Sequence, residues 1–161
     1  TITISHALTK VRFKISKAST YTGTGKLTEI SINGSTNNTI CSLGTLNIST
    51  GVITATTTSA HTITRTNASG LYTITASAPT DAQAAVLDFT LIPANFQAKE
   101  ISMSFTIDGK IFTFSVPAGA WEKSKINTYT LSLGGTGLTM SNVSVTVTEW
   151  AAGVNASGEL K

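Results

Sequence analysis

The stretch "SHALTKVRFKIS", residues 5–16, carries the alternation on which the fold assignment depends. Successive side chains of an extended strand point to opposite faces, so Val11, Phe13 and Ile15 lie together on one face of this segment. The residues between them are all basic. One large apolar face and one charged face predict a strand that buries a single side in a protein core.

The three cations of this strand, Lys10, Arg12 and Lys14, could hold nucleic acid or an anionic membrane, or could keep one sheet face in water. Three basic side chains without a neighbouring basic strand make too few phosphate contacts for useful affinity at physiological salt. The net charge is only +3, and charged residues make up 12% of the chain, against roughly 25% in ordinary soluble domains. We therefore expect no nucleic-acid partner, and a solvent-exposed cation stripe that discourages edge-to-edge pairing with other chains.

The same period of two recurs along the whole chain, whereas no stretch shows a sustained helical period of 3.6. Hydroxyl residues supply most of the polarity, and threonine favours strands because its branched Cβ packs well on a pleated surface. Short alternating segments separated by turn residues predict an all-β, antiparallel two-sheet β-sandwich. We expect strands at residues 8–16, 27–32, 39–48, 52–57, 61–65, 71–76, 86–92, 100–107, 110–116, 126–133 and 138–149.

Two local signals define connections between these strands. Asp108 and Gly109 predict a two-residue type I′ hairpin turn, because both residues tolerate positive φ values. The segment "PTDAQAAV" predicts the start of a helix, with Thr80 or Asp81 as N-cap and one or two turns behind it.

Residues that could carry out catalysis are few and scattered. Only His6 and His61 offer an imidazole, and most carboxylates flank turns. Cys41 lacks the CxxC spacing and the nearby histidines of a zinc site. The loop "TGTGKLT", residues 22–28, misses the first glycine of a phosphate-binding loop and has Leu27 where a hydroxyl should bind magnesium. We therefore expect a β-turn there, and a non-enzyme without catalytic, metal-binding or cofactor-binding residues.

The aromatic residues leave a second function open. The chain has eleven of them, and exposed rings could stack on sugars, which would make the domain a carbohydrate-binding module of a surface glycan-capture system. Rings that share the inner strand faces would instead fill the core of a sandwich. The alternation of the strands favours the core.

Two blocks have a recognisable pattern. "ISHALTKVRFKI" has the form His-Ala-Leu-x-Lys-Val, and the segment from "LDFTLIPANF" to "VTVTEW" has a Leu-x-Pro strand, a glycine-turned hairpin, a Trp, a Tyr-x-Leu strand and a final Glu-Trp. Together they resemble the C-terminal domain of the fimbrillin-like proteins of the Bacteroidales, the subunits of the type V pilus. The turn after Trp121 lacks the Gly-Lys that is usual in that family. The core and motif positions are His6, Leu8, Val11, Phe13, Ile15, Trp121, Tyr129 and Trp150.

The resemblance implies a transthyretin-like Greek-key β-sandwich that serves as a structural subunit of a surface fimbria and contributes to adhesion. It implies assembly with other pilin subunits by strand donation, in which an extended segment of one subunit adds to a sheet of the next. It also implies host surface ligands and an outer-membrane lipoprotein precursor. Members of the family carry a lipobox cysteine and another sandwich domain ahead of this block, so we expect the C-terminal half of a pilin.

We expect residues 1–150 to form a single β-sandwich domain, followed by a mobile polar tail at residues 151–161. No segment has the pattern of a membrane span or a signal peptide, which suggests a soluble, already processed chain. A donor strand needs several alternating large apolar side chains, and the tail offers only Val154 and Leu160. We therefore expect this chain by itself to be monomeric.

Overall fold

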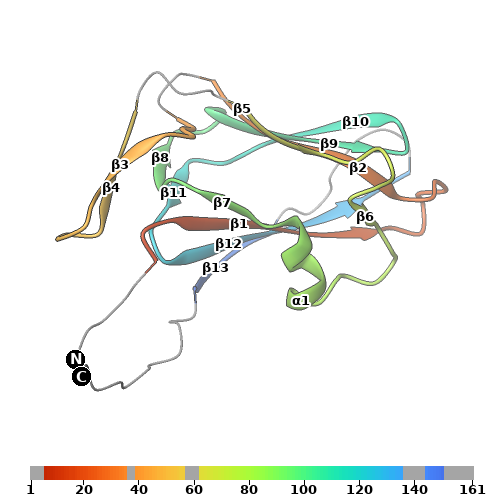
Figure 1. Cartoon of the computed structure of the whole chain (residues 1–161). Coiled ribbons are helices and arrows are strands. Elements are labelled where there is room, and N and C mark those ends of the chain that lie inside the picture. The colour runs from red at the N-terminus through yellow and green to blue at the C-terminus, as the bar shows by residue number, and fades with distance from the viewer. Residues whose placement is uncertain (1–5, 36–38, 57–61, 136–143, 151–161) are drawn as a thin grey trace, which may run out of the picture.

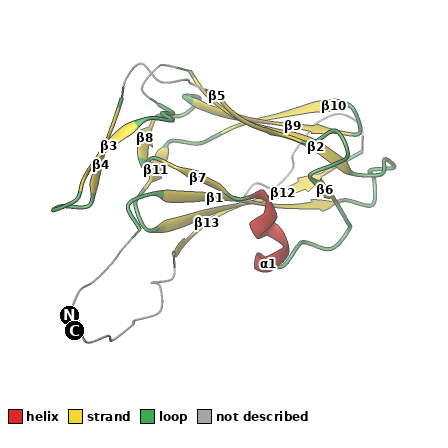
Figure 2. Cartoon of the chain, in the orientation of Figure 1, coloured by secondary structure: helices red, strands yellow, loops and turns green. Residues whose placement is uncertain are grey.

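The computed structural model describes residues 6–35, 39–56, 62–135 and 144–150 (Figure 1). Strands dominate the described chain, and helix is confined to one short segment (Figure 2). The strands are β1 (Thr9–Lys17), β2 (Lys26–Gly34), β3 (Gly44–Asn47), β4 (Val52–Ala55), β5 (Thr62–Thr66), β6 (Tyr72–Thr73), β7 (Phe89–Leu91), β8 (Ala94–Phe96), β9 (Ile101–Ile107), β10 (Lys110–Ser115), β11 (Gly119–Trp121), β12 (Lys125–Leu133) and β13 (Ser144–Glu149). The helices are α1 (Asp81–Ala84) and the 3₁₀ helix η1 (Ala85–Leu87).

The first sheet has the strand order β13-β12-β1-β7. β1 runs antiparallel to β7 but parallel to β12, with Phe13 opposite Tyr129 in the register. The expectation of a purely antiparallel sandwich is therefore wrong for this pair. Parallel neighbours need a long connection, and the strands of the second sheet lie between β1 and β12 in the chain. The sequence suggested that the cations of β1 discourage edge-to-edge pairing with other chains. This prediction is wrong, because β1 is a central strand and not a sheet edge.

The second sheet has the order β10-β9-β2-β5, and β6 also pairs with β2. All of these pairings are antiparallel. β9 and β10 form a hairpin whose two turn residues, Asp108 and Gly109, have φ values of 49° and 76°. Positive φ at both positions is the signature of a type I′ turn, so the predicted hairpin is confirmed.

The two sheets form the two layers of a sandwich (Figure 1). The Phe13 ring of β1 meets the Phe105 ring of β9 edge to face, with 5.2 Å between the centroids. Val11 and Ile15 point the same way and are fully buried. The all-β sandwich and the inward face predicted for β1 are thus confirmed, whereas the Greek-key connection stays a prediction.

The predicted helix start is present at the N-terminus of α1. Thr80 is the N-cap, and its hydroxyl accepts a hydrogen bond of 3.3 Å from the backbone N–H of Gln83. The Gln83 side chain accepts one of 2.9 Å from the Thr80 backbone. This reciprocal capping box satisfies two donors that a helix end would otherwise leave unpaired.

Other elements differ from the sequence-based prediction. β8 and β11 pair with each other and were not predicted, because three residues are too few to show a period. Residues 39–43 and 74–76 are not in strands, and residues 138–143 of the last expected strand lie outside the described residues. Within the described chain β3 and β4 pair only with each other, and they project from one end of the sandwich (Figure 1).

Candidate functional site

Two of the predicted motif residues, Trp121 and Tyr129, form a buried pair between β11 and β12. The indole N–H of Trp121 donates a hydrogen bond of 2.9 Å to the Tyr129 hydroxyl. The Phe96 ring of β8 packs on the indole with 5.0 Å between centroids. Burial raises the pKa of Tyr129, and the hydrogen bond from Trp121 acts in the opposite direction. With their polar atoms paired and their rings packed, the two residues hold the small β8–β11 sheet to the core.

Three more motif residues, His6, Leu8 and Trp150, meet where the described chain begins and ends. The imidazole of His6 stacks on the indole of Trp150, with 3.7 Å between centroids and 11° between planes. Lys10 Nζ lies 4.3 Å from the centroid of the same indole. The backbone N–H of Ser124 donates to the Leu8 carbonyl at 2.9 Å, and that of Trp150 donates to the Ser124 carbonyl at 2.8 Å. His6 is thus a stacking residue that lies against an aromatic ring.

The cations of β1 pair with two carboxylates, Asp81 at the start of α1 and Asp88 between η1 and β7. Arg12 donates two hydrogen bonds of 2.8 Å to the two carboxylate oxygens of Asp88. Lys14 Nζ lies 2.9 Å from Asp81 Oδ1. Hydrogen bonding to Asp88 raises the pKa of Arg12, and hydrogen bonding to Lys14 lowers that of Asp81. The expectation that this stripe is a bare solvent face is therefore wrong, because a segment more than sixty residues away covers it.

The glycine-containing loop before β2 does hold an anion, and that anion is the carboxylate of Asp108. It accepts hydrogen bonds from the hydroxyl of Tyr21 and the backbone N–H of Gly25, both at 2.8 Å, and from the backbone N–H of Lys26 at 2.9 Å. The Thr24 hydroxyl donates as well. Burial opposes ionisation, but the hydrogen bonds outweigh it and lower the pKa of Asp108. Burial, with the bond to Asp108, raises the pKa of Tyr21 to about 12. These donors serve the chain's own turn, so the loop is structural. The expected β-turn is not present, because residues 22–25 contain only a bend at Gly23 before β2 begins.

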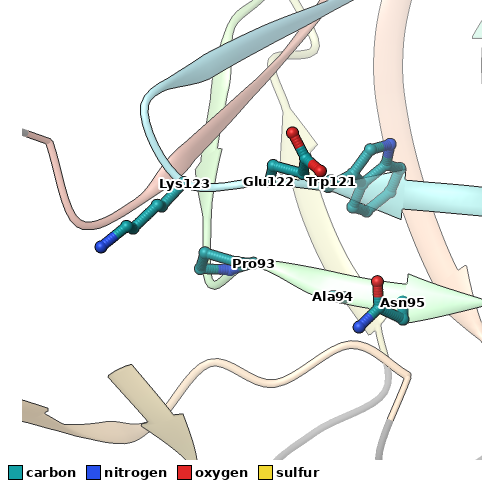
Figure 3. Close-up of a pocket in the computed structure, with 6 residues that line it drawn as sticks. All are labelled: Pro93, Ala94, Asn95, Trp121, Glu122 and Lys123. Carbon is teal, nitrogen blue, oxygen red and sulfur yellow. The ribbon is translucent and has the colours of Figure 1, made fainter. Parts of the chain in front are cut away.

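A cavity of about 500 Å³ lies between β8 and the connection that follows β11 (Figure 3). The side chains of Glu122 and Lys123 at its rim point in different directions (Figure 3). The indole of Trp121 is only 2% exposed and offers no free face for stacking. The lining residues are Pro93, Ala94, Asn95, Trp121, Glu122 and Lys123.

The surface has few features that a sugar-binding or catalytic domain would need. All eleven aromatic residues lie in the described part of the chain, and each of them is buried or half-buried. The carbohydrate-binding alternative therefore lacks its stacking platform. Among the described residues no group of three or more His, Cys, Asp or Glu could hold a metal ion, and no helix is long and apolar enough to cross a membrane. His61 lies outside the described residues, and Cys41 is buried.

The edge strand β13 has exposed apolar side chains on a face that its neighbour β12 buries. In an antiparallel pair, directly opposite residues share a face. Val145 lies opposite Tyr129, and Val147 lies opposite Asn127, and both of these β12 residues are buried. The two valines on the same face are nevertheless 45% and 54% exposed. The sandwich thus leaves the inner face of β13 uncovered, and within the described chain this strand pairs only with β12.

Sequence reasoning missed this edge. The alternation of Val145 and Val147 with threonine is visible in the sequence, and it correctly indicates a strand with an apolar side. A period of two does not tell whether that apolar side meets a second layer.

The described residues define a β-sandwich whose edge strand β13 exposes two valines, Val145 and Val147. The chain belongs to the fimbrillin-like family, whose model matches residues 1–150. The resemblance seen in the sequence is thereby confirmed. No curated protein matches the sequence.

Several solved structures share the fold. They include proteins described as cell adhesion proteins from Bacteroides uniformis (21% identity, TM-score 0.63) and Bacteroides ovatus (12%, 0.57), and a fimbrial protein from Bacteroides vulgatus (14%, 0.53). Each match covers 91% of this chain, but only 52%, 46% and 55% of the other chain, respectively. The chain therefore spans about half the length of these proteins.

Proposed function

We propose that this chain is a structural domain of a cell-surface fimbria that assembles with other subunits by strand donation and contributes to adhesion. Membership in the fimbrillin-like family supports a pilus or adhesion subunit at the cell surface. The fimbrial and cell adhesion proteins of similar fold support the same role. The observation that favours strand donation is the uncovered edge strand β13.

A strand laid along β13 would gain two kinds of contact. The free main-chain N–H and C=O groups of an edge strand are ready partners for an added strand. Val145 and Val147 would be covered by alternate side chains of the added strand, which supplies specificity as well as apolar burial. Neither contact needs a catalytic residue, in keeping with a non-enzymatic subunit.

The partners in this proposal are other pilin subunits, with host surface ligands as targets of the assembled fimbria. A precursor anchored to the outer membrane as a lipoprotein would deliver the subunit to the surface. These parts of the proposal concern a protein longer than this chain. In the similar structures, the part that matches this chain is only about half of the protein.

The test is Val147→Lys in the full-length subunit, expressed in its host and imaged by negative-stain microscopy. The side chain is half exposed, so lysine fits the folded domain, yet it places a charge where the added strand should lie. We expect surface filaments to be lost while the subunit still reaches the cell surface. Val86→Lys, at a valine 50% exposed in η1, is the matched control and should leave the filaments intact. Normal filaments with Val147→Lys would rule out strand donation at β13.

A further inference from the structure

The exposed aliphatic side chains of this domain are concentrated on two sheet edges. Eight large hydrophobic residues are exposed in the described chain, and six of them lie on β13 or in the hairpin of residues 43–55, which contains β3 and β4. The remaining two, Val86 and Ile111, are on different elements. The hairpin residues and their exposed fractions are Leu43 (63%), Leu46 (47%), Ile48 (91%) and Val52 (50%).

The tip of the hairpin is an ordered loop that presents Ile48 to solvent. The side-chain oxygen of Asn47 accepts hydrogen bonds from the backbone N–H groups of Ser49 at 3.0 Å and Thr50 at 3.2 Å. The Gly51 N–H donates to the Asn47 carbonyl at 2.8 Å, and its φ of +65° needs a glycine. A loop held by this many local bonds loses little conformational entropy when its apolar tip is buried by a partner.

The chemistry of the hairpin selects the kind of partner. No Asp, Glu, Lys or Arg occurs between Glu29 and Arg65, and no aromatic residue occurs between Tyr21 and Tyr72. Anionic membranes and nucleic acids require cations, and sugar rings and membrane interfaces favour aromatic side chains. β3 and β4 each keep one unpaired main-chain edge within the described chain. An uncharged strand edge with aliphatic side chains is the partner that satisfies both the main chain and the side chains.

We propose that the hairpin of one copy of this chain adds to the edge strand β13 of a second copy. The inference rests on the proposed function and names the donor: an internal hairpin instead of a terminal segment. β13 has the required features, since its residues 144–148 are uncharged and its valines alternate with threonine. Within the described part of one molecule, β3 and β4 pair only with each other and β13 pairs only with β12. The hairpin and β13 therefore each have a strand edge without a neighbouring strand in this part of the chain.

A contact between two different surfaces of the same chain has a consequence for assembly. Each copy that accepts a hairpin at β13 still offers its own hairpin to the next copy. Such heterologous contacts build open filaments when the rotation between copies does not close a ring. The hairpin-to-β13 contact thus has the symmetry that a fimbria requires.

The contact is small, and we expect it to be weak. A few aliphatic residues and one strand edge bury less than the roughly 1,200 Å² at which stable interfaces begin. We therefore expect the isolated chain to be monomeric at micromolar concentration and to associate at millimolar concentration, which departs from the expectation of a monomer based on the termini alone. Subunits tethered in a filament experience effective concentrations in this range.

The experiment measures the mass of the purified chain by sedimentation equilibrium up to millimolar concentration. We expect the average mass of the wild-type chain to rise with concentration. Leu46→Lys and Val147→Lys should each weaken self-association about tenfold or more, because each buries an unpaired charge in the contact. Val86→Lys is the matched control and should associate like the wild type. Far-ultraviolet circular dichroism confirms that each variant is folded.

Mixing the two defective variants tests the pairing itself. The Val147→Lys chain keeps an intact hairpin and the Leu46→Lys chain keeps an intact β13, so the mixture should form one-to-one dimers that do not grow. A mixture that stays monomeric, or a wild-type chain that stays monomeric at millimolar concentration, would overturn the inference.

Filament imaging of the full-length subunit separates this inference from the proposed function. Loss of filaments with Val147→Lys but not with Leu46→Lys would retain strand donation at β13 and reject the hairpin as its donor. Loss with both variants supports the inference, and normal filaments with Val147→Lys would reject strand donation at β13 itself.

Discussion

Replacing Arg12 by glutamine should destabilise the domain far more than replacing Lys14, although both cations lie on one face of β1. Arg12 and Asp88 share two hydrogen bonds of 2.8 Å, and their side chains are 11% and 10% exposed. The Asp81 side chain, which pairs with Lys14, is 73% exposed. Breaking a buried pair costs roughly 3–5 kcal/mol, whereas an exposed pair contributes about 0–1 kcal/mol. Because Asp88 keeps some water and Lys10 at 3.9 Å, we expect about 2–3 kcal/mol for Arg12→Gln and below about 1 kcal/mol for Lys14→Gln.

Urea unfolding followed by circular dichroism measures this difference as a shift of the midpoint at constant slope. The double variant Arg12→Gln/Asp88→Asn should recover part of the loss, because it leaves no unpaired charge under the helix segment. Equal midpoints for Arg12→Gln and Lys14→Gln would refute the assignment of Asp88 as a buried partner. Strict additivity of the Arg12 and Asp88 changes would refute their coupling.

Three further predictions concern the core, the buried pair and the anion-holding loop. Phe13→Ala should cost about 3–5 kcal/mol in the same urea assay because the ring is fully buried, and a loss below about 1 kcal/mol would contradict the face assignment of β1. Tyr129→Phe removes the acceptor of the Trp121 N–H, so it should cost about 1–3 kcal/mol and shift the tryptophan fluorescence; an unchanged midpoint would speak against the pair. The pKa of Asp108 is lowered from its ordinary value of 3.8, so its carboxylate stabilises the fold above that pH, and this stabilisation is lost as the pH falls further. Asp108→Asn should therefore flatten the fall of the unfolding free energy below about pH 4, and a fall as steep as in the wild type would exclude Asp108 as its source.

The sequence predicted the features that depend on neighbours along the chain. Val11, Phe13 and Ile15 point into the core as their spacing indicates, and the Asp108–Gly109 turn has the expected positive φ values. Thr80 caps the helix, because a hydroxyl three residues before Gln83 suits a capping box. Backbone sterics and local hydrogen bonds decide these features, and both are readable over a few residues.

The sequence did not predict which segments come together. The parallel pairing of β1 with β12 joins residues more than a hundred positions apart. The three-residue strands β8 and β11 are defined by their pairing with each other, which a local pattern does not show. The family resemblance, by contrast, was readable from two blocks of sequence, and the family model matches residues 1–150.

The sequence by itself determined the class of fold, the apolar side of each main strand and the absence of any recognisable catalytic motif. Only the tertiary structure decided what each strand face meets. It placed Asp88 against Arg12 and left Val145 and Val147 uncovered. The physical reason is that alternation describes the two faces of a strand, whereas burial and ion pairing depend on which distant segment docks there. A valine beside a second layer and a valine on an open edge have the same local sequence, and only the neighbouring sheet distinguishes a core from an assembly surface.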